Sequence, residues 1–319
     1  MTEPAKIMVW ASRAQEELLR EVLADESISL LAVGSDESAT AADLAATHHA
    51  ERLEDLRQAL HREDADLLWL AGPVDLEPAT LKLIGQKSLQ IVSSYPQPGS
   101  ISDLISQPDD VAAIGVLPLM QRSAGFRAAE EIFESFGRAE CINVSFRSDP
   151  SKGSLFSRLY DAMGVVTRRC GEADTIDAAL VSPTGDTPEN LGDLTGHMTV
   201  NLRFPENRSA SITISDRAGR WFRGITVLGP GGCLRIDEGQ FEWIGLDGAT
   251  IDSHTETEAP LSVGGIIAAQ LRRIVERRDS TEPPADHAKL MAACEAARVS
   301  SRTGEWESPR SVMRMFSRL

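Results

Sequence analysis

Residues 91–98, with the sequence IVSSYPQP, form a candidate active-site loop that contains no charged residue. The stretch has the form of a buried strand running into a proline-stiffened turn, and open α/β sheets often keep their chemistry at the ends of strands. Tyr95 can donate a hydrogen bond there, but it carries no charge at neutral pH. Two interpretations stay open: a working loop with unusual residues, or a loop that has lost its charges.

The other reactive side chains form no pattern typical of a metal or nucleophile site. The cysteines at 141, 170, 233 and 294 lie far apart, which argues against a zinc site and a disulfide framework and favours a reduced, cytoplasmic protein. A nucleophile elbow, Gly-x-Ser-x-Gly, is absent from the sequence. The glycines of 229–232 favour a hairpin turn over a phosphate loop, because no helical pattern follows them. His197 stays a candidate site histidine, although lining a strand is the simpler role.

Size and charge exclude some classes of partner. With 319 residues the chain exceeds the usual single-domain length, so we expect two domains. Its formal net charge of −16 would repel a phosphate backbone, so neither nucleic acid nor an anionic membrane is expected as a partner. The first residues lack the pattern of a secretory signal, and no apolar run has the length of a membrane span.

The first part of the chain has the rhythm of strand–helix units around a parallel sheet. We expect strands at 7–10, 28–33, 67–70, 89–92 and 112–117, with helices at 14–24, 41–49, 52–60, 78–87 and 123–136. Strands rich in Val, Ile and Leu, each followed by a helix, are typical of a doubly wound sheet. The sequence therefore predicts an α/β fold with a Rossmann-like parallel sheet in residues 1–120.

The pattern changes after residue 136. Strands are expected at 140–147, 177–182, 197–204, 208–216, 222–229, 232–238 and 240–245, a helix at 154–169, and two closing helices at 262–278 and 287–303. Strands with few helices between them indicate antiparallel pairing. Residues 121–319 are therefore predicted to form an α+β domain with a large, mainly antiparallel open sheet, whose terminal helix packs back on the first domain.

This layout, together with several motifs, resembles the glucose-fructose oxidoreductase, inositol dehydrogenase and MocA (Gfo/Idh/MocA) family of NAD(P)-dependent sugar oxidoreductases. The stretches LLAVGSDESATAADLA (30–45), ERLEDL to QIV (51–92), FRGITVLGPGGCLRIDEG (222–239) and HAKLMAACEAARVSSRTGEWESP (287–309) are similar to the family's. The resemblance implies NAD or NADP as the cofactor, no metal, and a sugar-like substrate. It also implies that the exposed face of the second sheet forms a homodimer or a larger homo-oligomer.

The resemblance also locates the cofactor-binding positions. The family's glycine-rich turn corresponds to ASRAQE (11–16), where Ala11, Arg13 and Glu16 stand at the glycine positions. Arg13 and Glu16 are expected to crowd the approach of the pyrophosphate, although Arg13 could instead contact a phosphate. Asp36, or Ser35 one place earlier, corresponds to the acidic residue that holds the ribose. Pro73 ends the strand motif Ala-Thr-Pro, here Ala-Gly-Pro.

The catalytic positions implied by the resemblance are Tyr95 and Asp161. Tyr95 stands at the lysine of the family's Glu-Lys-Pro turn, and Asp161 stands at the histidine of its Asp-x-Gly-x-His motif. Either Asp161 acts as a base, or it forms a surface ion pair with Arg158. We therefore expect a divergent member that has lost or weakened its dehydrogenase activity and has a binding, regulatory or structural role. An active oxidoreductase with an altered site and a pure assembly protein without a ligand are the alternatives.

Overall fold

The computed structural model describes residues 3–74, 76–87, 89–106, 114–117, 119–256, 262–276 and 287–316. The chain divides into two compact units. The first consists of Met1–Leu117, Ser151–Gly153 and Ser262–Pro284, and the second consists of Pro118–Pro150, Ser154–Leu261 and Ala285–Leu319. The chain thus returns to the first unit after residue 262, whereas the sequence-based division places all of residues 121–319 in the second domain.

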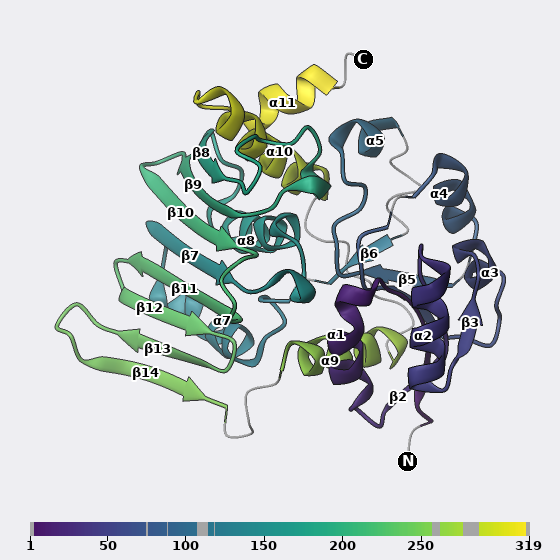
Figure 1. Ribbon diagram of the computed structural model, residues 1–319. Coiled ribbons are helices and arrows are strands. Elements are labelled where there is room, and N and C mark those ends of the chain that lie inside the picture. Colours follow the sequence, from purple (N-terminus) through teal and green to yellow (C-terminus); the bar gives the residue numbers. More distant parts are fainter. Residues whose placement is uncertain are drawn as a thin grey trace. The chain divides into compact units, whose positions relative to one another are not determined.

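Among the described residues, the first unit contains a six-stranded parallel sheet in the order β3-β2-β1-β4-β5-β6 (Figure 1). Its strands are β1 (Ala5–Trp10), β2 (Ile28–Gly34), β3 (Glu51–Leu53), β4 (Leu67–Leu70), β5 (Gln90–Ser93) and β6 (Ile114–Val116). The order runs in opposite directions on the two sides of β1, which is the doubly wound arrangement. This part of the predicted fold class is confirmed.

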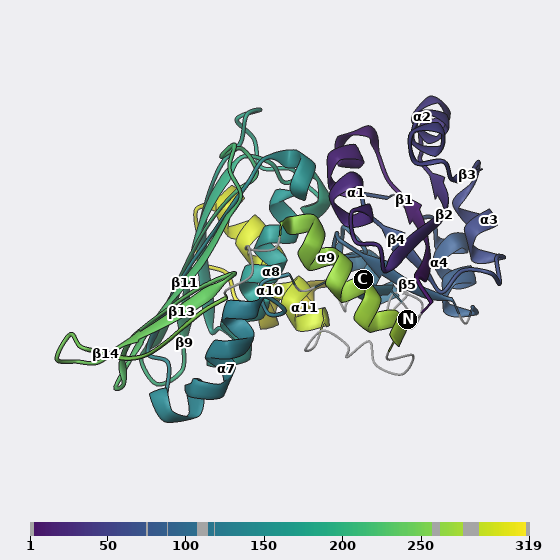
Figure 2. The ribbon, with the colours of Figure 1, turned by 90° about the horizontal axis from the view of Figure 1, so that it is seen from below.

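Helices connect these strands, and one of them comes from a distant part of the chain. The helices of this unit are η1 (Arg13–Gln15), α1 (Glu16–Leu23), α2 (Ser38–His48), α3 (Leu56–Leu60), α4 (Pro78–Gly85), α5 (Ile101–Ser106) and α9 (Val263–Glu276). Helix α9 lies beside α1 (Figure 2). The Glu21 carboxylate accepts hydrogen bonds from the Gly264 amide at 3.1 Å and from Lys152 Nζ at 2.7 Å. A Cβ at Gly264 would overlap Glu21, so this close packing requires glycine.

The prediction of one helix over residues 52–60 is wrong. Residues Glu51–Leu53 form the edge strand β3, in which Leu53 pairs with Gly34, and α3 begins only at Leu56. The Asp55 carboxylate accepts a hydrogen bond from the Arg57 amide at 2.9 Å and so caps α3. The apolar spacing of a short strand followed by a short helix had imitated one longer helix.

The second unit contains, among its described residues, an eight-stranded sheet in the order β14-β13-β12-β11-β7-β10-β9-β8. Only β7 and β10 pair in parallel within this ladder. The strands are β7 (Cys141–Arg147), β8 (Thr175–Val181), β9 (His197–Phe204), β10 (Arg208–Ser215), β11 (Phe222–Gly229), β12 (Gly232–Asp237), β13 (Gln240–Ile244) and β14 (Thr250–Thr255). The mainly antiparallel second sheet is therefore confirmed.

Helices pack against one face of this sheet. They include α7 (Ala124–Phe136), α8 (Leu155–Cys170) and α10 (His287–Thr303), with η3 (Leu191–Asp193) and α11 (Pro309–Phe316) nearby in the same unit, and the short turn η2 (Pro150–Lys152) marks the change of unit. Val200, Ile212 and Ile225 are buried on the covered face. The core of this unit therefore lies between the sheet and these helices.

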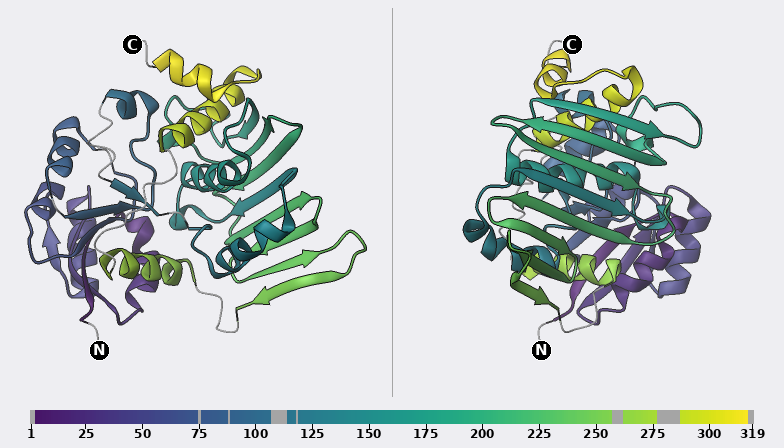
Figure 3. Two further views of the ribbon diagram at one scale, coloured as in Figure 1. Left: turned by 180° about the vertical axis from the view of Figure 1, so that it is seen from behind. Right: turned by 90° about the vertical axis from the view of Figure 1, so that its left-hand side faces the viewer.

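The right panel of Figure 3 shows the opposite face of the sheet, where most side chains of the central strands are polar. In the strands 199–204, 211–215 and 224–229, Thr199, Asn201, Thr213 and Thr226 alternate with the buried apolar residues. Phe222 and Leu228 of β11 are apolar and exposed.

None of the helices in the described part of the chain combines the length and the hydrophobicity needed to cross a membrane.

Candidate functional site

The turn after β1 is closed by its own side chains. The carboxamide oxygen of Gln15 accepts hydrogen bonds from the Ser12 amide at 3.1 Å and from the Ser12 hydroxyl at 2.5 Å. This pairing of residues at the start of a helix is a form of capping box. The Gln15 side chain is only 2% exposed, although glutamine is usually a surface residue. The turn therefore directs a polar side chain inward.

Gln15 joins the ends of three neighbouring strands. Its Nε2 donates to the Tyr95 hydroxyl, after β5, at 3.4 Å. Its Oε1 also lies against Gly72, after β4, where an added Cβ would come within 2.8 Å of that oxygen. The loops after β1, β4 and β5 are thus linked by uncharged groups at the carboxyl edge of the sheet.

A second contact closes the same edge on the other side of β1. Trp10, at the end of β1, is 5% exposed, and its ring lies where a side chain at Gly34 would be. Its Nε1 donates to Asp36 Oδ1 at 3.1 Å. Asp36, the predicted ribose ligand, is exposed, but one of its oxygens is already bonded within the chain.

The other predicted cofactor positions also lie in the loops after β1 and β4. Ala11 is buried, and its amide continues the β1–β2 pairing by donating to the Gly34 carbonyl at 2.9 Å. The Arg13 side chain is 69% exposed and pairs with Asp43 on α2 at 3.0 Å. Pro73 is exposed in the loop after β4. The expected crowding by Arg13 is therefore not observed, because its side chain points to solvent.

Tyr95 lies in a loop that is buried and held to its neighbours. Its side chain is 6% exposed, and its amide donates to Ser93 Oγ at 3.1 Å. The adjacent Ser94 accepts from Trp69 Nε1 at 2.9 Å, and the Ser94 amide donates to the Leu70 carbonyl at 3.0 Å. The loop thus positions the Tyr95 hydroxyl firmly, but against Gln15.

Asp161, on α8 in the second unit, is 6% exposed and forms a buried ion pair. Its Oδ2 accepts from Arg223 of β11 and from the Met120 amide at 3.1 Å, while Oδ1 has no partner among the described residues. The expected surface pair with Arg158 is wrong: that guanidinium is buried and donates to the Ser154 and Asp149 carbonyls. The sequence could not show the true partner, because Arg223 lies 62 positions further along the chain.

Arg223 also faces a second carboxylate. Its Nε lies 3.7 Å from Glu238 Oε1, and Glu238 accepts from Trp221 Nε1 at 2.7 Å. The guanidinium stacks over the rings of Phe146 and Trp221, at 5.0 and 4.4 Å from their centroids. We call Asp161, Arg223 and Glu238 the acid–arginine cluster. It places two carboxylates beside one guanidinium, with Asp161 and Arg223 buried and Glu238 partly exposed.

Burial sets the protonation of this cluster. Loss of solvation raises the pKa of Asp161, against the opposing effect of the Arg223 charge. Burial likewise raises the pKa of Glu238, and the nearby Asp161 charge acts in the same direction. Both carboxyls therefore bind a proton more readily than in water.

The hydroxyl of the neighbouring Tyr160 also has a hydrogen-bond partner. Its hydroxyl lies 2.6 Å from His287 Nδ1, at the start of α10. Burial raises the pKa of Tyr160, so the phenol stays protonated. His197, the other candidate site histidine, is exposed at the start of β9. Among the described residues, no group of His, Cys, Asp and Glu side chains is arranged to hold a metal ion.

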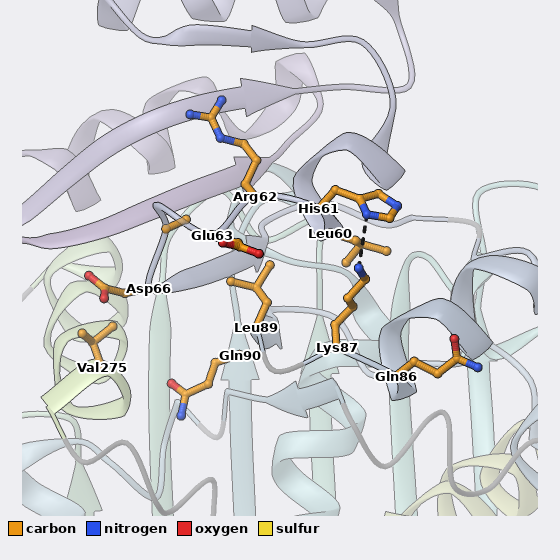
Figure 4. Close-up of a pocket in the computed structure, with 11 residues that line it drawn as sticks. Leu60, His61, Arg62, Glu63, Asp66, Gln86, Lys87, Leu89, Gln90 and Val275 are labelled. Atoms are coloured by element: carbon orange, nitrogen blue, oxygen red, sulfur yellow. Dashed lines mark hydrogen bonds between the residues drawn. The ribbon is translucent and has the colours of Figure 1, made fainter.

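A pocket of the first unit lies at the opposite edge of its sheet (Figure 4). It has a volume of about 630 Å³ and is lined by residues next to the amino ends of β4 and β5, among them Asp66, Gln90, His61 and Lys87. Lys87 Nζ lies 3.2 Å from His61 Nδ1. Doubly wound sheets bind ligands at the carboxyl ends of their strands, so this pocket is not the candidate site.

The residues at the carboxyl edge do not fit a dinucleotide bound in the usual way. That mode needs backbone N–H groups that face the pyrophosphate and an acidic side chain that faces the ribose. Here the Ser12 amide is bonded to Gln15, and Asp36 is bonded to Trp10. The sequence reasoning missed both Gln15 and Trp10, although Ser12-x-x-Gln15 has the spacing of a capping box.

Comparison with known proteins gives the fold. No family model and no curated protein matches this sequence. Among solved structures, an oxidoreductase from Agrobacterium radiobacter in complex with NAD+, L-tartaric acid and magnesium is 16% identical, with 97% of this chain and 99% of that chain covered and a TM-score of 0.72. Levoglucosan dehydrogenase in complex with NADH and levoglucosan is 13% identical, with 95% and 99% covered and a TM-score of 0.73.

A third similar structure is an NAD-binding oxidoreductase from Klebsiella pneumoniae, 13% identical, with 96% of this chain and 98% of that chain covered and a TM-score of 0.70. The chain therefore has the two-part fold of these oxidoreductases over nearly its whole length. This fold is the one that the resemblance implied.

Proposed function

We propose that this chain is a divergent Gfo/Idh/MocA-family protein that keeps the oxidoreductase fold, has lost or greatly weakened NAD(P)-dependent sugar dehydrogenation, and has a binding, regulatory or structural role. The observation that carries this proposal is the pairing of Asp161 with Arg223. A base must accept a proton from a substrate, whereas this carboxylate already compensates a buried guanidinium. Protonating it would leave Arg223 with Glu238 as its remaining nearby carboxylate at 3.7 Å.

A turnover assay tests this proposal. The purified chain is mixed with NAD+ or NADP+ and with sugars and polyols, levoglucosan among them, and reduced cofactor is followed by absorbance. We expect the wild type to form no more reduced cofactor than the Asp161→Asn variant. Turnover that Asp161→Asn and Tyr95→Phe abolish, while both variants stay folded, would overturn the proposal.

Such turnover would support the second candidate function, an active oxidoreductase with an altered site. In that function Tyr95 donates a proton, Asp161 is the base and Asp36 holds the ribose of NAD or NADP. The raised pKa of Asp161 favours it, because a general acid–base group works best when its pKa lies near the operating pH.

The proposed role includes self-association through the uncovered face of the eight-stranded sheet. This face carries Arg147, Arg203 and Arg235 together with Asp177, Asp237 and Glu242, so its charges balance although the chain carries −16. A balanced face can meet its own copy without net repulsion. Sedimentation should show a dimer or larger oligomer that Thr226→Arg dissociates, and a wild-type monomer would contradict this.

The proposal also includes the place and the small ligand of the protein. We propose a cytoplasmic protein that binds a sugar-like small molecule and neither nucleic acid nor a membrane. The acidic charge of the chain supports the exclusion of polyanionic partners.

A further inference from the structure

We infer that Gln15 and Trp10 are built-in occupants of the ligand crevice of the first sheet, and that these two side chains are what excludes a dinucleotide. The inference deepens the proposed function and rests on the proposed loss of dinucleotide chemistry. It names a cause in the chain itself, which can be removed by substitution.

The crevice is defined by the topology of the sheet. The order β2-β1-β4 places the switch point of the doubly wound sheet at β1, and ligands of such sheets bind beyond the carboxyl ends of the strands at that point. Gln15 comes from the turn after β1 and is buried against Gly72 from the loop after β4. Its carboxamide therefore lies where the two diverging halves of the sheet would admit a ligand.

Trp10 repeats the arrangement on the other side of β1. Its ring occupies the space above Gly34 of β2, and its Nε1 bonds to Asp36. On each side of β1, a glycine of the neighbouring segment faces a large side chain that belongs to β1 or its turn. The spaces beside Gly34 and Gly72 are thus filled by side chains of β1 and of the turn that follows it.

The polar atoms of the crevice are already used. Oε1 of Gln15 accepts a hydrogen bond from the Ser12 amide, and Nε2 donates one to the Tyr95 hydroxyl. A phosphate bound at this helix start would need the Ser12 amide as a donor. An entering phosphate would have to break these bonds, and none of the bonded side chains of Ser12, Gln15 and Tyr95 carries a positive charge. By contrast, Arg13 is exposed and paired with Asp43, and Glu16 lies 3.7 Å from Arg20. Neither of these two charged residues fills the crevice.

Calorimetric titration with ADP-ribose tests the inference. ADP-ribose carries the adenosine and pyrophosphate groups but lacks the nicotinamide, so its binding does not depend on turnover. The variants are Gln15→Ala, Trp10→Phe and their combination, with Arg13→Ala as the matched control. We expect the combined variant to bind ADP-ribose at least tenfold more tightly than the wild type, and Arg13→Ala to stay within twofold of the wild type.

Three results would overturn the inference. They are a wild type that binds as tightly as the combined variant, a folded combined variant without the gain, and a gain in Arg13→Ala instead. If the combined variant does not fold, Gln15→Asn with Trp10→Phe replaces it under the same criterion, since this pair keeps an amide and a ring. Turnover by the wild type would overturn the proposed function, whereas ADP-ribose binding without turnover would overturn only this inference.

Discussion

The carboxyl edge of the first sheet and the acid–arginine cluster of the second unit differ in how they hold polar groups. At the first, Ser12, Gln15 and Tyr95 form a chain of neutral hydrogen bonds. At the second, Asp161 and Arg223 are charged and buried together. Tyr95 in the first region and Asp161 in the second stand at positions where the family resemblance implies catalysis. One of these side chains is held by a neutral hydrogen bond and the other by a buried ion pair.

The two regions differ in the free-energy cost of losing one interaction. A neutral hydrogen bond contributes about 1 kcal/mol, and its loss is tolerated when the partner finds another. A buried charge without a counter-charge costs several kcal/mol, so each member of the cluster depends on the others. The first unit should therefore tolerate the loss of one of these neutral hydrogen bonds better than the second unit tolerates the loss of a charge from its cluster.

Removing the Arg223 guanidinium should have the largest effect on stability. Arg223→Met should lower the free energy of unfolding by about 3–5 kcal/mol, because Asp161 and Glu238 would stay buried without a positive charge. Urea denaturation of the wild type and the variant measures this difference in the free energy of unfolding. The matched control is Arg235→Met on the exposed face, whose pair with Glu242 spans 3.7 Å and should contribute less than about 1 kcal/mol. Equal losses in the two variants would contradict the structural role of the cluster.

A smaller effect is expected where Trp10 fills the space of Gly34. Gly34→Ala should destabilise by about 1–3 kcal/mol, because the new methyl group would overlap the indole ring. The same change in a Trp10→Leu background should cost less, and a double-mutant cycle measures the coupling. Gly239→Ala serves as the control, since a Cβ there meets nothing nearer than 4.0 Å. Additive losses for Gly34 and Trp10 would show that the ring does not use this space.

The smallest effect on stability is expected from a change in pH. This effect distinguishes the charged acid–arginine cluster from the neutral hydrogen bonds at the carboxyl edge of the first sheet. The folded-state pKa values of Asp161 and Glu238 are raised, so the stability tied to these groups is present at low pH and is lost as pH rises through those values. Relative to Glu238→Gln, the wild type should therefore gain stability between neutral pH and about pH 4, where free carboxyls titrate. Denaturation at several pH values measures the difference.

Tyr95→Phe is the control for the pH experiment. It removes an uncharged group from the first unit, so the variant should lose at most about 1 kcal/mol, by the same amount at each pH. Glu242→Gln, at a half-exposed carboxylate, controls for the general effect of the acidic chain. A pH dependence that Glu238→Gln leaves unchanged would show that burial does not raise the pKa of that carboxyl.

Much of the fold could be predicted from the sequence, because buried strands and amphipathic helices leave strong hydrophobic patterns. The run AKIMVW of β1 is buried almost throughout, and such runs were predicted as strands. Strand β14 was missed because TIDSHT is polar and largely exposed, so it has no apolar alternation. The short edge strand β3 was missed for a related reason, since two of its three residues are exposed.

The candidate site was less accessible to prediction. The positions of Tyr95 and Asp161 came from resemblance to a family, and their partners came only from the structure. Gln15 and Tyr95 are 80 positions apart, and Asp161 and Arg223 are 62 apart, so no local spacing connects them. The identity of Arg13 suggested a crowded turn, but the direction of a side chain depends on neighbours such as Asp43 that the sequence does not place.

The return of α9 to the first unit has a consequence for synthesis on the ribosome. Chains emerge from the N-terminus, and domains generally fold as they emerge. Here α1 and the Glu21 carboxylate meet their partner Gly264 only after the strands of the second unit have been translated. Nascent chains arrested before residue 262 should therefore expose the surface of α1 that α9 covers, which makes them candidates for chaperone binding until translation supplies the missing helix.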